Sequence, residues 1–130
     1  MSHRMQSVQK ADPWSANCPS RAIISILASK WVLLLLPQLR KGPKRNGDLM
    51  RALDGVSQKM LTQTLRDLEH YGIVARHNYF EVPPHVEYSL TRIGASLAEV
   101  VESLDEWVIK NYRTMMNSAA SASGTVDGRS

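Results

Sequence analysis

The chain has 130 residues, of which 43% are apolar and 22% are charged, a composition ordinary for one globular domain. Its longest apolar run, residues 31–36, is much shorter than the roughly 20 residues a helix needs to cross a bilayer, so we expect no membrane span. The single cysteine excludes an intrachain disulfide and a multi-cysteine zinc site. The net charge of +4 is only mildly basic and is by itself weak evidence for nucleic-acid binding.

The two ends of the chain differ in composition from its middle. Residues 1–16 are polar and aperiodic and predict a flexible arm; they contain no apolar stretch followed by a cleavage site, so we expect no secretory signal and a cytoplasmic protein. Residues 117–130 (NSAASASGTVDGRS) predict a disordered tail, because small polar side chains bury too little surface to order themselves. The folded domain is therefore expected over residues 17–116.

Two apolar helices are predicted first. Pro19 suits the first position of a helix, where its missing N–H costs nothing, and apolar residues recur at helical spacing up to residue 27. A second helix is expected over residues 30–39, with residues 31–36 apolar on every side and therefore buried. Pro37 costs about 3 kcal/mol in a helix interior, so we expect a kink or an early end near Leu36.

A short helix and a longer one follow. Residues 46–53 predict a short helix, and an Asp-Gly turn follows it. Ser57 is expected to cap the longer helix, which ends near Gly72 because glycine readily adopts the left-handed conformation that closes helices. One face of this helix is a stripe of leucines at positions 61, 65 and 68, and the other face is polar, with Lys59, Thr62, Gln63 and Arg66.

A hairpin and a last helix complete the domain. Residues 73–80 and 86–90 predict two strands, and two prolines place the segment between them in a loop. Thr91 is expected to cap a helix that reaches about residue 116. This helix has more apolar surface than a small domain needs, which suggests a partner helix. The residues assigned to that interface are Leu97, Val100, Val101, Leu104, Trp107, Val108 and Tyr112.

The order of these elements predicts a winged helix-turn-helix, a mainly α fold with a small β-hairpin. The charge distribution agrees with this interpretation. Residues 40–85 contain eight basic and five acidic side chains, whereas residues 91–116 contain three basic and four acidic ones. An anionic partner should therefore meet the centre of the chain.

A helix that enters the major groove must present side chains that reach base edges while its other face packs. Residues 57–71 meet this requirement, since glutamine can pair with adenine and arginine or lysine with guanine. The candidate DNA-contacting residues on this helix are Ser57, Gln58, Lys59, Thr62, Gln63 and Arg66. The cations ahead of the short helix, expected to hold the DNA backbone, are Lys41, Lys44 and Arg45. The wing, residues 76–88, would lie in an adjacent groove through Arg76, His77, Asn78 and His85.

Three stretches of sequence go beyond this pattern: KW at 30–31, SQKMLT at 57–62 and VPPHVEYSLT at 82–91. With their surroundings, residues 18–107, they closely resemble the HxlR-type family of bacterial transcriptional regulators, relatives of MarR. The resemblance implies a homodimer formed through the terminal helices, which binds a pseudo-palindromic operator in double-stranded DNA at the nucleoid, most simply as a repressor. His85 stands where such proteins commonly have arginine, which makes a DNA contact there dependent on pH.

Cys18 is a candidate sensor. Some members of the resembled family sense oxidants or electrophiles through a cysteine at this place, immediately before proline. A thiolate at a helix N-terminus is stabilised by the helix dipole, which lowers the thiol's pKa. Because the chain has one cysteine, such a sensor needs modification by a small molecule or a Cys18 bridge between subunits. The alternative is a small helix-starting residue that packs at the dimer interface.

Other classes of function are less well supported. A winged helix that binds protein instead of DNA would need a neutral or apolar helix at 57–71, and Lys59 and Arg66 argue against that. No HExxH, GxSxG, glycine-rich phosphate loop or paired-carboxylate motif is present, so we expect neither an enzyme nor a cofactor. The four histidines lack a metal-ligand spacing, so no metal site is expected. A small-molecule effector against Trp31, Trp107 and Tyr112 stays open, although such aromatics are more often core.

Overall fold

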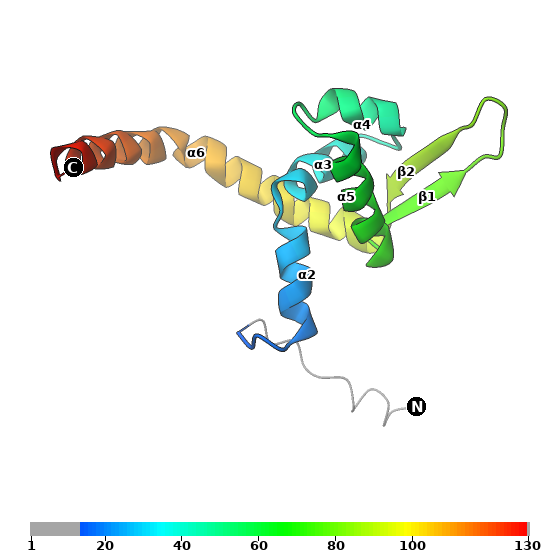
Figure 1. Ribbon diagram of the computed structural model, residues 1–130, viewed down its shortest axis with the longest axis horizontal. Coiled ribbons are helices and arrows are strands. Elements are labelled where there is room, and N and C mark those ends of the chain that lie inside the picture. Colours follow the sequence, from blue (N-terminus) through cyan, green and yellow to red (C-terminus); the bar gives the residue numbers. More distant parts are fainter. Residues whose placement is uncertain (1–13, 130) are drawn as a thin grey trace.

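The computed structural model describes residues 14–129, with side chains described up to residue 122. In chain order it contains α2 (Pro19–Leu27), α3 (Lys30–Arg40), α4 (Asn46–Ala52), α5 (Gln58–His70), β1 (Val74–Asn78), β2 (Val86–Leu90) and α6 (Arg92–Arg129). Figure 1 shows α3, α4 and α5 gathered at one end of α6, with the hairpin projecting beside them. The predicted mainly helical fold with a small hairpin is confirmed. Most of the predicted arm lies outside the described residues.

The first two helices begin where the sequence predicts. Cys18 has an extended backbone and Pro19 is the first residue of α2. α3 follows after a short break, and the Oγ of Ser29 caps it by accepting a hydrogen bond from the N–H of Val32 at 3.3 Å. The apolar run predicted that α3 would be buried on every side. This prediction is wrong, since Leu34 is 48% exposed.

Pro37 does not end α3. The helix continues to Arg40, so the expectation of an early end near Leu36 is wrong. Leu35 and Leu36 are fully buried, and Leu39, in the turn after the proline, is 3% exposed. Burial of these leucines holds the helix together across the proline and offsets the hydrogen bond that the ring removes.

α4 and α5 form the helix-turn-helix. α4 is fixed at its start by the N–H of Arg45, which donates to Asp48 Oδ2 at 3.0 Å. The turn between the helices contains Gly55, whose φ of +89° lies in the region that favours glycine. Ser57 caps α5 as predicted, since its Oγ accepts a hydrogen bond from the N–H of Met60 at 3.0 Å. The predicted stripe of leucines is buried, together with one threonine, at Leu61, Thr64, Leu65 and Leu68.

The hairpin is antiparallel and pairs Val74 with Leu90 at its base and Asn78 with Val86 near its tip. A third segment joins it: the N–H of Lys44 donates to the carbonyl of Tyr88 at 2.9 Å, and the N–H of Tyr88 donates back at 2.8 Å. The chain that leads into α4 is therefore tied to the wing.

The core lies between α3, α5, the hairpin and the first turns of α6. Thr91 caps α6 as predicted, accepting a hydrogen bond from the N–H of Gly94 at 3.1 Å. A Cβ atom on Gly94 would lie 2.0 Å from the carbonyl oxygen of Ile73, so only glycine allows α6 to approach the hairpin this closely. This contact fixes the direction in which α6 leaves the domain.

α6 extends beyond its predicted end. It continues through residues 117–129, where the sequence predicts a disordered tail. Residues 117–123 are rich in alanine, the strongest helix former, and contain no proline. Because these residues extend an existing helix, they do not need to nucleate one. Residues 117–122 are exposed, so this part of the segment is helical without burying apolar surface.

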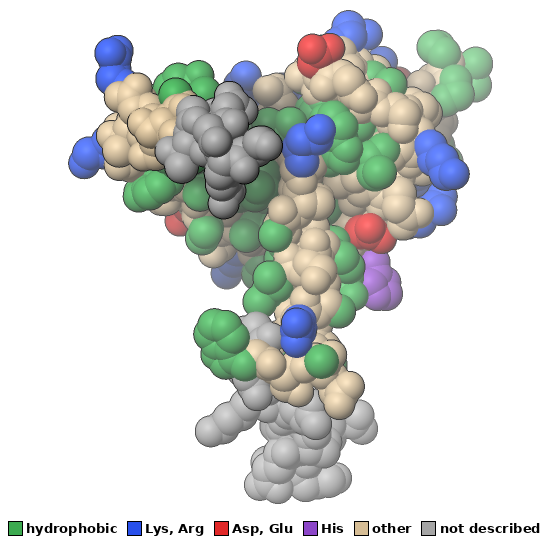
Figure 2. Space-filling view, turned by 60° about the vertical axis from the view of Figure 1, so that its left-hand side comes forward, with side chains coloured by type: hydrophobic (Ala, Val, Ile, Leu, Met, Phe, Trp, Pro, Cys, Tyr) green, Lys and Arg blue, Asp and Glu red, His purple; other side chains and the backbone are tan. Residues whose placement is uncertain are grey.

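The outer face of α6 is apolar and exposed. Figure 2 shows apolar side chains gathered in the angle between α6 and α2. Val100 is 62% exposed, Trp107 54% and Tyr112 57%. One residue assigned to the dimer interface lies elsewhere: Val101 is 2% exposed in the domain core. Its assignment is wrong because two apolar stripes run along α6, and one of them packs within the chain. Leu97 packs against that core but is only partly buried, so its assignment stays a prediction.

Candidate nucleic-acid interface

The outer face of α5 is the centre of the candidate interface. Lys59, Thr62, Gln63 and Arg66 are all exposed on it, opposite the buried leucines. Ser57 differs from these residues, because its hydroxyl accepts the capping hydrogen bond of α5 and lies at the helix start. Within α5, the amide of Gln63 donates to Asp67 Oδ1 at 2.9 Å, so this side chain is partly held by its own helix. The predicted readers therefore lie together on one surface.

Gln58, the first residue of α5, is held by side chains on both helices. Its Oε1 accepts a hydrogen bond from Asn46 Nδ2 at 2.7 Å, and its Nε2 donates to Asn46 Oδ1 at 3.0 Å. Nε2 also donates to Thr62 Oγ1 at 2.9 Å. Sequence reasoning missed Asn46, and its only signal was a polar residue opening the predicted short helix beside a basic segment.

Two of the cations ahead of α4, Lys44 and Arg45, lie near this surface, whereas Lys41 lines a pocket between α3 and α6. Lys41 and Arg45 are exposed, and Lys44 is partly exposed, with its backbone bound to the wing. Asp48 lies among them, and the N–H of Arg45, aided by the Arg51 guanidinium at 2.8 Å, holds the pKa of Asp48 below its ordinary value. Asp48 therefore stays ionised and orients Arg51, whereas Lys41, Lys44 and Arg45 make no ion pair among the described residues.

On the wing, Arg76 and His77 are both exposed. As neighbours on β1 they point to opposite faces of the hairpin, so Arg76 faces α5 while the ring of His77 lies against Tyr79 at 4.2 Å. A narrow pocket of about 100 Å³ lies between the wing and α5, and Arg66 and Arg76 line it from opposite elements. Asn78 has a local role, since its Oδ1 accepts a hydrogen bond from the N–H of Phe80 at 2.8 Å. Phe80 is 87% exposed beyond it.

His85 is held inside the wing. Its Nδ1 lies 3.1 Å from Glu81 Oε1, its Nε2 lies 2.9 Å from Glu87 Oε2, and its side chain is only 18% exposed. The ring of Tyr79 stacks on it at 4.3 Å, and the Tyr79 hydroxyl donates to Glu87 at 3.1 Å. The hydrogen bond from His85 lowers the pKa of Glu87, and the bond to Glu87 raises the pKa of Tyr79. Sequence reasoning missed Tyr79, Glu81 and Glu87 as the partners of His85.

Cys18 lies at the other end of the molecule from the wing, immediately before α2. It is 7% exposed, and its Sγ lies 3.0 Å from the Oγ of Ser20. Cys18 is the N-cap residue of α2, so the sulfur lies at the helix start as predicted. Its side chain makes no capping hydrogen bond.

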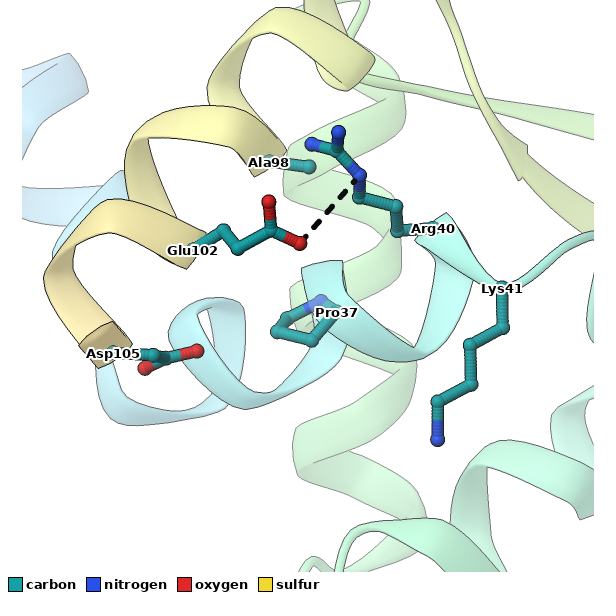
Figure 3. A pocket seen from close by; sticks show the side chains of 6 residues that line it. All are labelled: Pro37, Arg40, Lys41, Ala98, Glu102 and Asp105. Atoms are coloured by element: carbon teal, nitrogen blue, oxygen red, sulfur yellow. Dashed lines mark ion pairs between the residues drawn. The ribbon is translucent and has the colours of Figure 1, made fainter. Parts of the chain in front are cut away.

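A pocket of about 270 Å³ lies between α3 and α6 (Figure 3). Arg40 and Lys41 approach it from α3 and its end, Glu102 and Asp105 approach it from α6, and Arg40 Nε lies 3.9 Å from Glu102 Oε2. The three aromatic residues considered for a small-molecule effector do not line this pocket. Trp31 packs against the core, and Trp107 and Tyr112 are exposed on α6.

Among residues 14–122, no three histidine, cysteine or acidic side chains are placed to hold a metal ion. No single described helix has the length and apolar composition of a membrane span, and only α2 and α3 together, bent by 69° at their junction, reach that combination.

The comparisons with known proteins agree with this geometry. The HTH-type transcriptional regulator YtfH of Escherichia coli K12 is 42% identical over 106 residues, which cover 82% of this chain and 84% of the relative. The structure of YtfH from Salmonella typhimurium is similar, with a TM-score of 0.80 and 39% identity over 85% of this chain and 99% of that one. The redox regulator HypR in its reduced form has a TM-score of 0.70 and 36% identity, over 76% of this chain and 98% of that one.

A helix-turn-helix followed by a hairpin wing, with polar side chains on the outer face of the second helix, defines the class of winged-helix transcriptional regulators. Residues 26–116 match the HxlR-like helix-turn-helix family. The chain belongs to this family of transcriptional regulators, a non-enzymatic class.

Proposed function

We propose that the protein is a homodimeric, sequence-specific regulator that binds double-stranded DNA and represses transcription from a pseudo-palindromic operator. α5 enters the major groove, the wing lies beside it, and the cations ahead of α4 bind phosphates. The observation that carries the proposal is the polar face of α5, exposed between Arg45 and Arg76 while its leucines are buried.

The charges of the site support this function. Lys59 and Arg66 carry positive charge on the outer face of α5, and neither makes an ion pair among the described residues. Arg66 and Arg76 line the same pocket between α5 and the wing, so positive charge is concentrated where these two elements would meet DNA. A module that binds a neutral protein surface would have no use for these charges.

The test is selection of binding sites from random and genomic duplex DNA, followed by titration at several salt concentrations. We expect an enriched two-fold sequence and an affinity that falls steeply with salt. Arg66→Ala should lose about 1–3 kcal/mol of binding and relax base preference. Arg113→Ala, which removes the same side chain from α6, is the matched control and should bind normally. The absence of an enriched site at low salt, with salt-insensitive binding to a protein, would identify an interaction module instead.

The proposed homodimer rests on the apolar outer face of α6. Leu104, Trp107 and Val108 are each more than a third exposed on one long helix, and a second copy would cover them. Two α5 helices related by two-fold symmetry would then meet successive major grooves. Sedimentation equilibrium should give twice the chain mass, whereas a monomer at all concentrations contradicts this part of the proposal.

Cys18 is proposed as the site at which an oxidant or a quinone-type electrophile causes release of DNA. The support is its place at the start of α2 and the structural similarity to HypR, a protein described as a redox regulator. Mass spectrometry after treatment should locate the modification at Cys18, and Cys18→Ser should stay on DNA after the same treatment. Release of the serine variant by the oxidant would end this part of the proposal.

A further inference from the structure

We propose that Asn46 is a specificity-determining positioning residue, which holds the side chain of Gln58 in the orientation that reads a base. The inference rests on the proposed function, since it concerns how α5 reads DNA. Asn46 opens α4 and Gln58 opens α5, so the pair joins the two helices of the helix-turn-helix at their first residues.

The pair is geometrically complete. Each amide donates one hydrogen bond to the other and accepts one in return, at 2.7 and 3.0 Å. Both distances are those of good amide hydrogen bonds. Reciprocal pairing couples the two amides, because reversing the Gln58 amide alone would place oxygen against oxygen and nitrogen against nitrogen.

The hydrogen-bond count of Gln58 limits what it can read. Both N–H groups of Nε2 are engaged, one by Asn46 and one by Thr62, and Oε1 retains one lone pair. A glutamine that reads adenine donates to N7 and accepts from N6. The pair with Asn46 occupies the one edge of the Gln58 amide on which an acceptor and a donor lie side by side, so Gln58 cannot bind both atoms of adenine in this orientation. Its remaining lone pair can accept one hydrogen bond from an amino group on a base edge, such as N6 of adenine or N4 of cytosine.

An unpositioned glutamine has more freedom. Gln58 is exposed, so without Asn46 its amide rotates and presents either its oxygen or its nitrogen to a given base edge. Discrimination between bases would then fall, although the phosphate contacts from Lys44 and Arg45 would still hold the protein on DNA. Asn46 therefore acts on base preference and not on total affinity.

The experiment compares wild-type protein, Asn46→Leu, Gln58→Ala and the double variant on a pool in which each operator position is randomised. Leucine has nearly the size of asparagine and keeps the helix while removing both hydrogen bonds. We expect Asn46→Leu to lose about tenfold in discrimination at the base pair that Gln58→Ala also loosens. The double variant should lose no more there than Gln58→Ala alone. Other positions of the operator should keep their preferences.

Two further variants separate positioning from structural support. Asn46→Asp keeps the size of the side chain but places a carboxylate oxygen against Gln58 Oε1, so it should loosen the same base preference, and its added negative charge should weaken binding to all sequences. Asn17→Leu, the same change ahead of α2 and far from α4, should match wild type. An equal loss on every sequence in Asn46→Leu, or an unchanged preference, overturns the inference while DNA binding by the wild type stands. A wild-type protein that selects no sequence overturns the proposed function, and this inference with it.

Discussion

α5 and α6 each bury one apolar stripe in the domain core, but the faces opposite these stripes differ in chemistry. On α5 the residues opposite the buried leucines are lysine, threonine, glutamine and arginine. On α6 the residues opposite the buried Ala98 and Val101 are apolar again, including Val100 and Trp107. The buried stripe of a helix therefore describes the fold, whereas the chemistry of its exposed face supports the partner that we propose for it: DNA for α5 and a second apolar helix for α6.

The largest expected effect tests the inner face of α5. Leu61 is fully buried, so Leu61→Ala should lower the free energy of unfolding by about 2–5 kcal/mol, through lost burial and the cavity left behind. Lys59→Ala, two positions away on the outer face, should change stability by less than about 0.5 kcal/mol. Urea unfolding followed by circular dichroism measures both variants. Equal losses would remove the distinction between the two faces.

The outer face of α6 should give the next largest effect. Trp107 is 54% exposed in the single chain, and Trp107→Ala should weaken self-association by about 2 kcal/mol or more, if this side chain is buried by the second copy. The neighbouring Glu106→Ala is the control and should leave the association constant nearly unchanged. Analytical ultracentrifugation gives both constants, and circular dichroism confirms that each variant is folded. An association constant that does not change in Trp107→Ala would show that the dimer interface lies elsewhere.

A smaller effect is expected at the edge of the DNA surface. Lys44→Ala removes one proposed phosphate contact, so binding should weaken about equally on all sequences and the slope of affinity against salt should fall by roughly one. Lys110→Ala, which removes the same charge from α6, should change neither quantity. Fluorescence anisotropy on specific and scrambled duplexes measures both. A change in base preference in Lys44→Ala would show that this side chain reads bases.

The sequence predicted the parts of the molecule that local periodicity determines. The spacing of Leu61, Leu65 and Leu68 indicates α5 and its buried face, and Ser57 and Thr91 mark helix starts, because capping depends on neighbouring residues only. The outer face of α5 follows from the same spacing, so its readers could be named before the fold was known.

Contacts between distant segments could not be predicted in this way. Asn46 and Gln58 are twelve residues apart, and their pairing depends on the angle between two helices. Val101 was assigned to an interface because periodicity shows two apolar stripes on α6 without showing which one packs within the chain. Pro37 was expected to kink α3 or to end it near Leu36; the helix continues to Arg40, and the burial of Leu36 and Leu39 depends on contacts that the local sequence does not show.

The smallest expected effect lies in the wing, where Tyr79, His85 and Glu87 bind one another. The hydrogen bonds from His85 and Tyr79 hold the pKa of Glu87 below its ordinary value of 4.5. A carboxyl whose pKa is lower in the folded chain stabilises the fold above its unfolded pKa, and this stabilisation is lost as the pH falls through the folded value. Wild-type protein should therefore lose melting temperature below about pH 4.5 more steeply than Glu87→Gln, which has no charge to lose. Glu99→Gln, an exposed change on α6, is the control and should follow the wild type. Thermal unfolding between pH 3 and pH 7 measures the three curves, and parallel curves would mean that the Glu87 network contributes nothing to the stability of the wing.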